Sequence, residues 1–180
     1  YKIRRKYFKV MFKKVCIIGC GLIGSSIARA IRKQNLSTKI VSSNRSDLVN
    51  KKVIELKIVD DSNSDTKKMA EGSDLIIIAT PLSSYENVIL KIKDSLKNGS
   101  ILTDVGSVKE NVIGLIEKNV PKNVSWISSH PIAGTEESGP EAGFSELFEN
   151  RWCILTPSKK VNDKDINLLA TFWKKIGSKV

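Results

Sequence analysis

The chain has 180 residues, of which 41% are hydrophobic and 27% are charged, a composition typical of a folded globular domain. Its formal net charge of +11 is concentrated at one end, because residues 1–14 contain seven of the 30 basic residues and no acidic one. The rest of the chain, with 23 basic and 19 acidic residues, has no stripe of positive charge, and no apolar run reaches the ~20 residues of a membrane span. We therefore expect neither a nucleic-acid nor a membrane partner, the alternative being that the basic tail contacts RNA or an acidic membrane.

Residues 1–13 are predicted to be a disordered basic tail, and residues 14–180 are predicted to form one domain. The N-terminus lacks the apolar segment of a secretory signal. The three cysteines, Cys16, Cys20 and Cys153, have no metal-ligand spacing, which favours buried thiols in the reducing cytoplasm and no metal site. Because the chain starts without methionine and ends just after a predicted helix, we expect a fragment truncated at its C-terminal end.

In chain order, short apolar runs alternate with segments of helical spacing. The runs predict strands at 14–19, 39–43, 74–80, 100–105, 124–128 and 152–156, and the spacing predicts helices at 22–34, 84–97, 108–119 and 163–176. Several strands are apolar throughout, as in a parallel sheet covered on both faces. The pattern predicts an α/β fold with a doubly wound, Rossmann-type parallel sheet and helices on both faces.

A glycine-rich turn joins the first strand to the first helix. In "VCIIGCGLIGSSIARAI", Gly19, Gly21 and Gly24 form G-x-G-x-x-G, with Leu22 and Ile23 in the last gap. The first glycine permits a tight turn, the second lets the backbone approach a pyrophosphate, and the third lets helix and strand pack closely. The free amides of the helix N-terminus favour phosphate. The motif predicts dinucleotide binding, and the alternative is a merely structural glycine turn.

The second strand ends without the carboxylate that bonds the ribose of NAD in many such folds. Its tip reads "SSNRS", so Asn44 and Arg45 occupy the expected place. An arginine can pair with the 2′-phosphate of NADP, which a carboxylate would repel. We therefore favour NADP over NAD within an NAD(P) site, the alternative being a solvated loop arginine.

Two further strand ends carry residues that a ligand could meet. Thr80 and Pro81 end the third predicted strand, where they either line the cofactor path or simply stop the strand. Gly106 permits a close backbone approach, and Ser107 is placed to cap the next helix while keeping a proton to donate. All of these lie at the carboxyl ends of strands, where doubly wound sheets bind ligands.

His130 is the only histidine, and it precedes a long polar loop, "PIAGTEESGPEAGF". Loops of that length without secondary structure are uncommon in compact domains unless they are functional or disordered. Oxidation of a carbinol by hydride removal needs a base for the hydroxyl proton, and a neutral imidazole suits this role. His130 is therefore the candidate general base, the alternative being a structural histidine.

The last helix carries an apolar stripe at helical spacing in "INLLATFWKKIG". We expect this stripe to pack on the sheet, as the apolar faces of crossover helices do. Its members are Ile166, Leu169, Phe172, Trp173 and Ile176.

Four motifs together resemble the nucleotide-binding half of prephenate and arogenate (cyclohexadienyl) dehydrogenases: "GCGLIGSS", "DVGSVK", "HPIAGTEESGPEAGF" and "NRWCILTP". The resemblance implies NAD(P)-dependent oxidative decarboxylation of prephenate, arogenate or both, giving 4-hydroxyphenylpyruvate or tyrosine in tyrosine biosynthesis. It makes His130 the catalytic histidine and Ser107 a catalytic serine near the nicotinamide. It also makes Gly134, Thr135 and Glu136 the loop that closes over substrate.

The resemblance also implies what this chain lacks. Family members have a C-terminal helical domain that makes them homodimers and supplies an arginine to the substrate carboxylates, so we expect the isolated chain to be inactive. Asn44 stands where many members have aspartate, which weakens the expectation of NAD. Two alternatives are another Rossmann oxidoreductase of the β-hydroxyacid dehydrogenase type and a non-catalytic dinucleotide-binding module.

Overall fold

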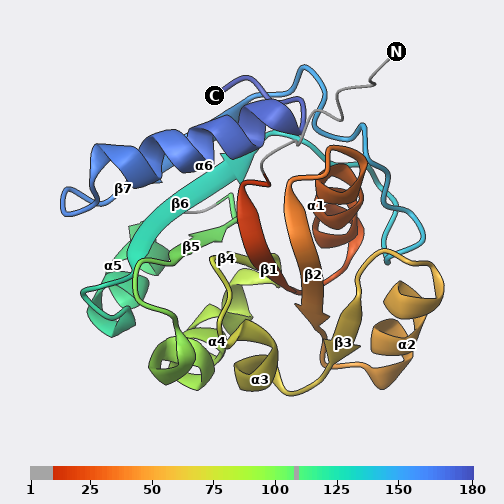
Figure 1. The fold of residues 1–180 in the computed structure, drawn as a ribbon, viewed down its shortest axis with the longest axis horizontal. Helices are drawn as coiled ribbons and strands as arrows, with labels where there is room; N and C mark the ends of the chain where they lie inside the picture. Colours follow the sequence, from red (N-terminus) through yellow and green to blue (C-terminus); the bar gives the residue numbers. More distant parts are fainter. Residues whose placement is uncertain (1–9, 108–109) are drawn as a thin grey trace, which may run out of the picture.

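The structure is a computed structural model that describes residues 10–107 and 110–180. Its centre is a seven-stranded sheet in the order β3-β2-β1-β4-β5-β6-β7 (Figure 1). The strands are β1 (Phe12–Ile18), β2 (Ser37–Ser43), β3 (Asp61–Asn63), β4 (Leu75–Ile78), β5 (Ile101–Asp104), β6 (Ser125–Pro131) and β7 (Cys153–Pro157). The chain reverses its winding direction between β1 and β4, which is where doubly wound sheets open a crevice for a ligand.

Helices cover both faces of the sheet, as predicted (Figure 1). The helices are α1 (Leu22–Lys33), α2 (Asp47–Glu55), α3 (Thr66–Ala70), α4 (Tyr85–Ile92), α5 (Glu110–Asn119) and α6 (Asp163–Lys175). The first core cluster joins one face to α1, α2 and α6, and the second joins the other face to α3, α4 and α5. The Rossmann-type α/β prediction is confirmed, with one correction to the sheet.

The predicted parallel sheet has one exception at its last strand, because β7 pairs antiparallel with β6. A parallel pair needs a crossover, which is usually a helix. Residues 132–152, all of them described, contain no helix, so the chain turns back at the edge where β6 ends and runs beside it in the opposite direction.

The sequence pattern also missed three short elements, β3, α2 and α3. The strand β3 has the sequence "DSN", which gives no apolar signal, and it lies at an edge of the sheet, beside β2 alone. The predicted helix 84–97 is shorter than expected, since 3₁₀ turns at Leu82–Ser84 and Lys93–Ser95 flank α4. Strand β1 begins at Phe12, inside the predicted tail, while residues 1–9 of that tail lie outside the described residues.

The apolar stripe of α6 packs on the sheet, as predicted. Leu169, Phe172 and Trp173 are fully buried in the first core cluster, with Ile176 beside them. The Trp173 ring meets the rings of Phe148 and Phe172 edge to face, with centroids 5.5 and 5.6 Å apart. Such aromatic pairs stabilise by about 0.5–1.5 kcal/mol beyond the burial of their area. Most of this stripe is therefore core, and Ile166 at its start is half-buried against the same cluster.

All three cysteine side chains are buried. Burial raises the pKa of Cys16 to about 12 and the pKa of Cys20 to about 11, which keeps both as unreactive thiols at neutral pH. We expect neither Cys16 nor Cys20 to react with Ellman's reagent in the native chain, and all three thiols to react after unfolding in guanidinium chloride. Rapid reaction of Cys20 in the folded chain would show that the glycine turn opens.

Two classes of feature are absent from residues 10–107 and 110–180. No helix there is long and apolar enough to cross a bilayer. No three His, Cys, Asp or Glu side chains there gather as metal ligands do.

Candidate functional site

The glycine turn follows β1 at the carboxyl ends of the parallel strands. This boundary of the sheet, where several strands end side by side, is called the carboxyl edge, or simply the edge, below. The register pairs Ile18 with Ser43 and with Ile78, and Ile78 with Asp104, so β1, β2, β4 and β5 end side by side. Parallel strands that end in register bring the residues after them together. The predicted cofactor residues therefore share one edge of the sheet.

Each glycine has the surroundings that its predicted role requires. Gly19 has φ +94°, and a Cβ there would lie 2.8 Å from the Ala79 carbonyl oxygen, so the turn passes close to the end of β4. A Cβ on Gly24 would lie 2.0 Å from the Gly19 carbonyl oxygen, which is too close for any side chain. A Cβ on Gly21 would meet nothing within 4 Å. The second glycine thus faces open space, as a backbone that approaches a pyrophosphate must.

The N-terminus of α1 follows directly and is suited to phosphate. Its N-cap, Gly21, provides no side-chain cap, and the first amides of a helix have no intrahelical partner. Leu22 and Ile23 are half-buried and pack against the first core cluster, and this packing fixes the turn to the core. These free amides, together with the positive end of the helix dipole, favour an anion at this point.

Asn44 lies at the predicted position, but its side chain is engaged within the protein. Its Oδ1 accepts a hydrogen bond from the Cys20 amide at 2.6 Å, and its Nδ2 donates to Asn50 Oδ1 at 3.0 Å. Asn44 is 9% exposed, so it ties the tip of β2 to the glycine turn. Arg45, by contrast, is exposed, and the next residue, Ser46, caps α2 by accepting from the Val49 amide.

Thr80 lies beside the glycine turn with an unused hydroxyl. Its Oγ1 is buried and has no hydrogen-bond partner within the described part of the chain. Its methyl carbon is 2.9 Å from the point where a Cβ of Gly19 would stand, which places Thr80 against the turn. Pro81 is exposed, and its carbonyl accepts from the Ser84 amide. A buried hydroxyl without a partner at this edge fits a bound polar ligand.

Asp104 fixes the turn after β5 through a hydrogen bond to its backbone. The Gly106 amide donates to Asp104 Oδ2 at 3.0 Å, and a Cβ on Gly106 would lie 3.0 Å from both that oxygen and the Tyr85 hydroxyl. Ser107 follows and is exposed at the edge. The predicted helix from residue 108 starts at Glu110 in the structure, and residues 108–109 lie outside the described residues.

His130 lies within β6 and not, as predicted, beyond its end. The strand was expected to end at residue 128, but it continues to Pro131 because β7 pairs with it, and His130 stands opposite Ile154. The side chain is half-buried on the same face of the sheet as Ser128, two residues earlier. The backbone of His130 is therefore held within the sheet, and the long loop begins only after the end of β6.

The loop after β6 turns back onto α1. Gly134, Thr135 and Glu136 are exposed, and Thr135 Oγ1 accepts from the Glu137 amide at 3.2 Å. Further along, a Cβ on Gly143 would lie 2.1 Å from Ser25 Oγ. The loop thus connects the end of β6, beside His130, to the helix that follows the glycine turn.

Sequence reasoning gave no role to several residues that shape this edge. They are Asn50 and Ser62, which bond Asn44 or its neighbours, Tyr85 and Asp104 under the β5 turn, and Gly143 against α1. Only Gly143 carried a local signal, since an unexplained glycine in a long loop suggests a close approach.

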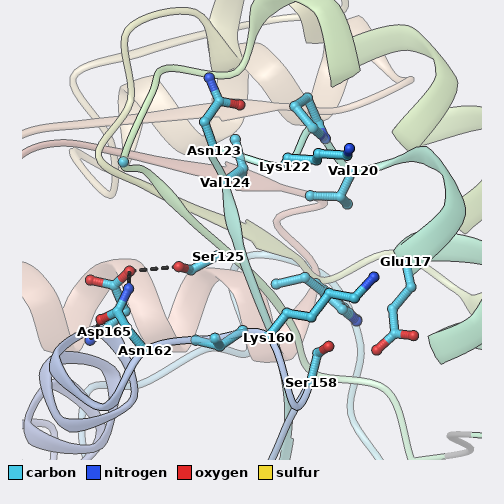
Figure 2. A pocket seen from close by; sticks show the side chains of 14 residues that line it. Glu117, Val120, Lys122, Asn123, Val124, Ser125, Ser158, Lys160, Asn162 and Asp165 are labelled. Carbon is cyan, nitrogen blue, oxygen red and sulfur yellow. Dashed lines mark hydrogen bonds between the residues drawn. The ribbon is translucent and has the colours of Figure 1, made fainter.

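A pocket of about 290 Å³ lies at the opposite edge of the sheet, where β6 begins (Figure 2). Glu117 and Lys160 are among its lining residues, and beside it Ser125 Oγ donates to Asp165 Oδ2 at 2.5 Å. None of the predicted site residues lines this pocket. It is separate from the edge that carries the glycine turn and His130.

A profile of the prephenate dehydrogenase nucleotide-binding domain matches residues 27–180. The chain belongs to this family. Among curated relatives, the cyclohexadienyl dehydrogenase of Zymomonas mobilis is 35% identical over 170 residues, which are 94% of this chain and 58% of that protein. The prephenate dehydrogenase of Lactococcus lactis is 37% identical over 146 residues, 80% of this chain and 41% of that protein. This member of the prephenate dehydrogenase family thus spans little more than half of such relatives, or less.

Solved structures of the family share the fold closely. The prephenate dehydrogenase of A. aeolicus, in complex with hydroxyphenyl propionate and NAD+, superposes with a TM-score of 0.86 at 29% identity, covering 93% of this chain and 58% of that one. The Synechocystis arogenate dehydrogenase superposes with a TM-score of 0.81 at 26% identity, covering 92% of this chain and 58% of that one. A 3-hydroxyisobutyrate dehydrogenase, at 12% identity and a TM-score of 0.69, shares the fold alone.

Proposed function

We propose that the whole protein catalyses NAD(P)-dependent oxidative decarboxylation of prephenate, arogenate or both, and that this chain is its nucleotide-binding half. One observation carries the proposal. The glycine turn, Thr80, Ser107 and His130 all follow, or lie within the last residues of, strands that end at one edge of the sheet. Family membership supports it, because relatives are named prephenate and cyclohexadienyl dehydrogenases.

Some residues at this edge are assigned to cofactor binding and others to the substrate. The amides of the α1 N-terminus and the open space at Gly21 would hold the pyrophosphate, and the unpartnered Thr80 hydroxyl would face the cofactor. When bound, NAD(P) supplies the hydride acceptor. His130 takes the proton of the ring hydroxyl, the carbinol carbon gives up its hydride, and loss of carbon dioxide makes the ring aromatic. Ser107 orients the hydroxyl, while Gly134, Thr135 and Glu136 cover the substrate.

The activity is tested by assaying the protein with the region that its longer relatives carry. Absorbance at 340 nm should rise with prephenate, arogenate or both when NAD or NADP is present. Turnover of a β-hydroxyacid in place of either substrate would establish the other Rossmann oxidoreductase class. Dinucleotide binding without turnover of any of these substrates would make the protein a non-catalytic module.

The finer proposal on the cofactor is a preference for NADP. It is supported by the exposed Arg45 at the tip of β2, where Asn44 brings no negative charge to repel a 2′-phosphate. Arg45→Ala should weaken NADP binding by about 1–3 kcal/mol, the usual contribution of a charged hydrogen bond, and leave NAD binding unchanged. Fluorescence titration with both dinucleotides measures this difference. Equal losses for the two, or none, would refute the preference.

The remainder of the substrate site is proposed to lie on an apolar face beside His130. Ile132, Trp152 and Ile154 are 51%, 57% and 50% exposed, and the β6–β7 pairing places all three on the face that His130 shares. Large exposed apolar patches mark interaction sites. We infer that in the whole protein the helical region of the longer relatives covers this face and that the whole protein is a homodimer. Without that region, the isolated chain is expected to self-associate or to lack turnover.

A further inference from the structure

Asp104, the last residue of β5, is a fully buried acid with donors on both carboxylate oxygens. Its Oδ1 accepts from the Ser128 hydroxyl at 2.7 Å and from the Ser129 amide at 3.1 Å. Its Oδ2 accepts from the Gly106 amide at 3.0 Å and from the Tyr85 hydroxyl at 3.1 Å. These donors come from α4, from the turn after β5, and from β6.

The contacts favour a carboxylate at this position, because two of the four donors are backbone N–H groups, one at each oxygen. An ionised carboxylate only accepts, and its two oxygens offer about four acceptor positions. An asparagine would present its NH₂ group to one backbone N–H, that of Gly106 or that of Ser129, and would lose that hydrogen bond. Burial and the charge of Asp104 raise the pKa of Tyr85, so the Tyr85 hydroxyl keeps the proton that it donates.

Each donor lies next to a residue of the candidate site. Tyr85 begins α4, shortly after Thr80 and Pro81. Gly106 directly precedes Ser107, and Ser129 directly precedes His130. One side chain therefore links the three strand ends that carry the proposed cofactor path, the serine and the histidine.

The segment before His130 is also held from the other face of the sheet. Ser129 Oγ is 2.7 Å from Thr103 Oγ1, and the indole N–H of Trp173 donates to Ser129 Oγ at 3.3 Å. Asp104 bonds Ser128 on one face, while Thr103 and Trp173 bond Ser129 on the other. Such fixation on both faces leaves the backbone at His130 little freedom.

Stability alone is a poor explanation for this arrangement. Taking a carboxylate out of water costs several kcal/mol, and well-packed apolar residues often stabilise a core as well as a buried charge does. A geometric task explains the charge better, because hydrogen bonds fix direction as well as distance.

We propose that Asp104 is a positioning residue, which sets the placement of the Ser107 turn relative to His130 without touching the substrate. The proposal rests on the proposed function for its catalytic consequence. Its structural part, a clamp that joins the β5 turn to β6, stands independently and is tested separately.

The test compares two serines of the same strand in the protein that carries the complete substrate site. Ser128→Ala removes a hydroxyl that donates to Asp104, and Ser125→Ala removes one that donates to Asp165 at the opposite edge of the sheet. We expect Ser128→Ala, and likewise Tyr85→Phe, to lower kcat roughly 10–100-fold, as misplaced catalytic groups do, with dinucleotide Kd within about twofold of wild type. Ser125→Ala should leave kcat unchanged. Unchanged kcat in both Ser128→Ala and Tyr85→Phe would overturn the positioning role, as would equal losses in Ser128→Ala and Ser125→Ala.

Hydrogen exchange tests the clamp in the present chain, whatever its activity. Ser128→Ala should speed amide exchange at residues 105–107 as well as at 127–130, while Ser125→Ala changes neither segment. Faster exchange confined to 127–130 would show that Asp104 does not couple the two strand ends. If the wild-type protein turns over neither substrate, the proposed function fails, and the exchange result alone decides the clamp.

Discussion

Gly21→Ala is expected to weaken dinucleotide binding strongly while the chain stays folded, whereas Gly24→Ala is expected to destabilise the fold itself. A methyl group on Gly21 meets nothing within 4 Å, so the cost to stability should stay below about 1 kcal/mol, the usual cost of alanine at a helix N-cap. The same methyl occupies the approach of a pyrophosphate, so NAD(P) affinity should fall at least about tenfold, or ~1.4 kcal/mol.

A methyl group on Gly24 would stand 2.0 Å from the Gly19 carbonyl oxygen, which is backbone and cannot rotate away. The free energy of unfolding should fall by about 3 kcal/mol or more, at the upper end for an overpacked site. Urea unfolding and dinucleotide titration measure the two effects. Gly114→Ala is the matched control, because its methyl is also unopposed but lies in α5, away from the turn. Equal destabilisation by Gly21→Ala and Gly24→Ala would contradict the separate roles.

His130→Asn should lower turnover by ~10²–10⁴ in the protein with its complete substrate site, the range for loss of a positioned general base. Asparagine keeps a polar side chain of similar reach but cannot take the hydroxyl proton. Dinucleotide affinity should not change, because His130 lies in β6 while the glycine turn follows β1. Stopped-flow measurement of NAD(P)H formation, with an independent Kd, separates the two quantities.

The control for His130 lies at the other edge of the sheet. Lys160→Ala changes the pocket where β6 begins and should leave turnover at the wild-type level. Wild-type turnover in His130→Asn would remove the histidine from the mechanism. A large loss in Lys160→Ala would mean that the pocket at the opposite edge takes part in the reaction.

The sequence alone determined the features that depend on local patterns. The apolar runs predicted six of the seven strands, because a strand buried on both faces needs continuous apolar residues. The spacing of the three glycines predicted a tight turn with close packing. Gly19 has a positive φ that other residues rarely adopt, and at Gly24 the Gly19 carbonyl oxygen leaves no room for a side chain. The stripe of α6 predicted the burial of Phe172 and Trp173 for the same local reason.

Only the tertiary structure decided the features that depend on pairing between distant segments. The direction of β7 follows from a connection without a helix, and the position of His130 within β6 follows from its pairing with Ile154. The strand β3 forms because β2 offers it an edge, although "DSN" has no strand pattern of its own. Asp104 reads in the sequence as an ordinary acid after a strand. Its role appears only when Tyr85, Gly106, Ser128 and Ser129 converge on it, because donors 19 and 24 residues away in the chain leave no periodic signal around it.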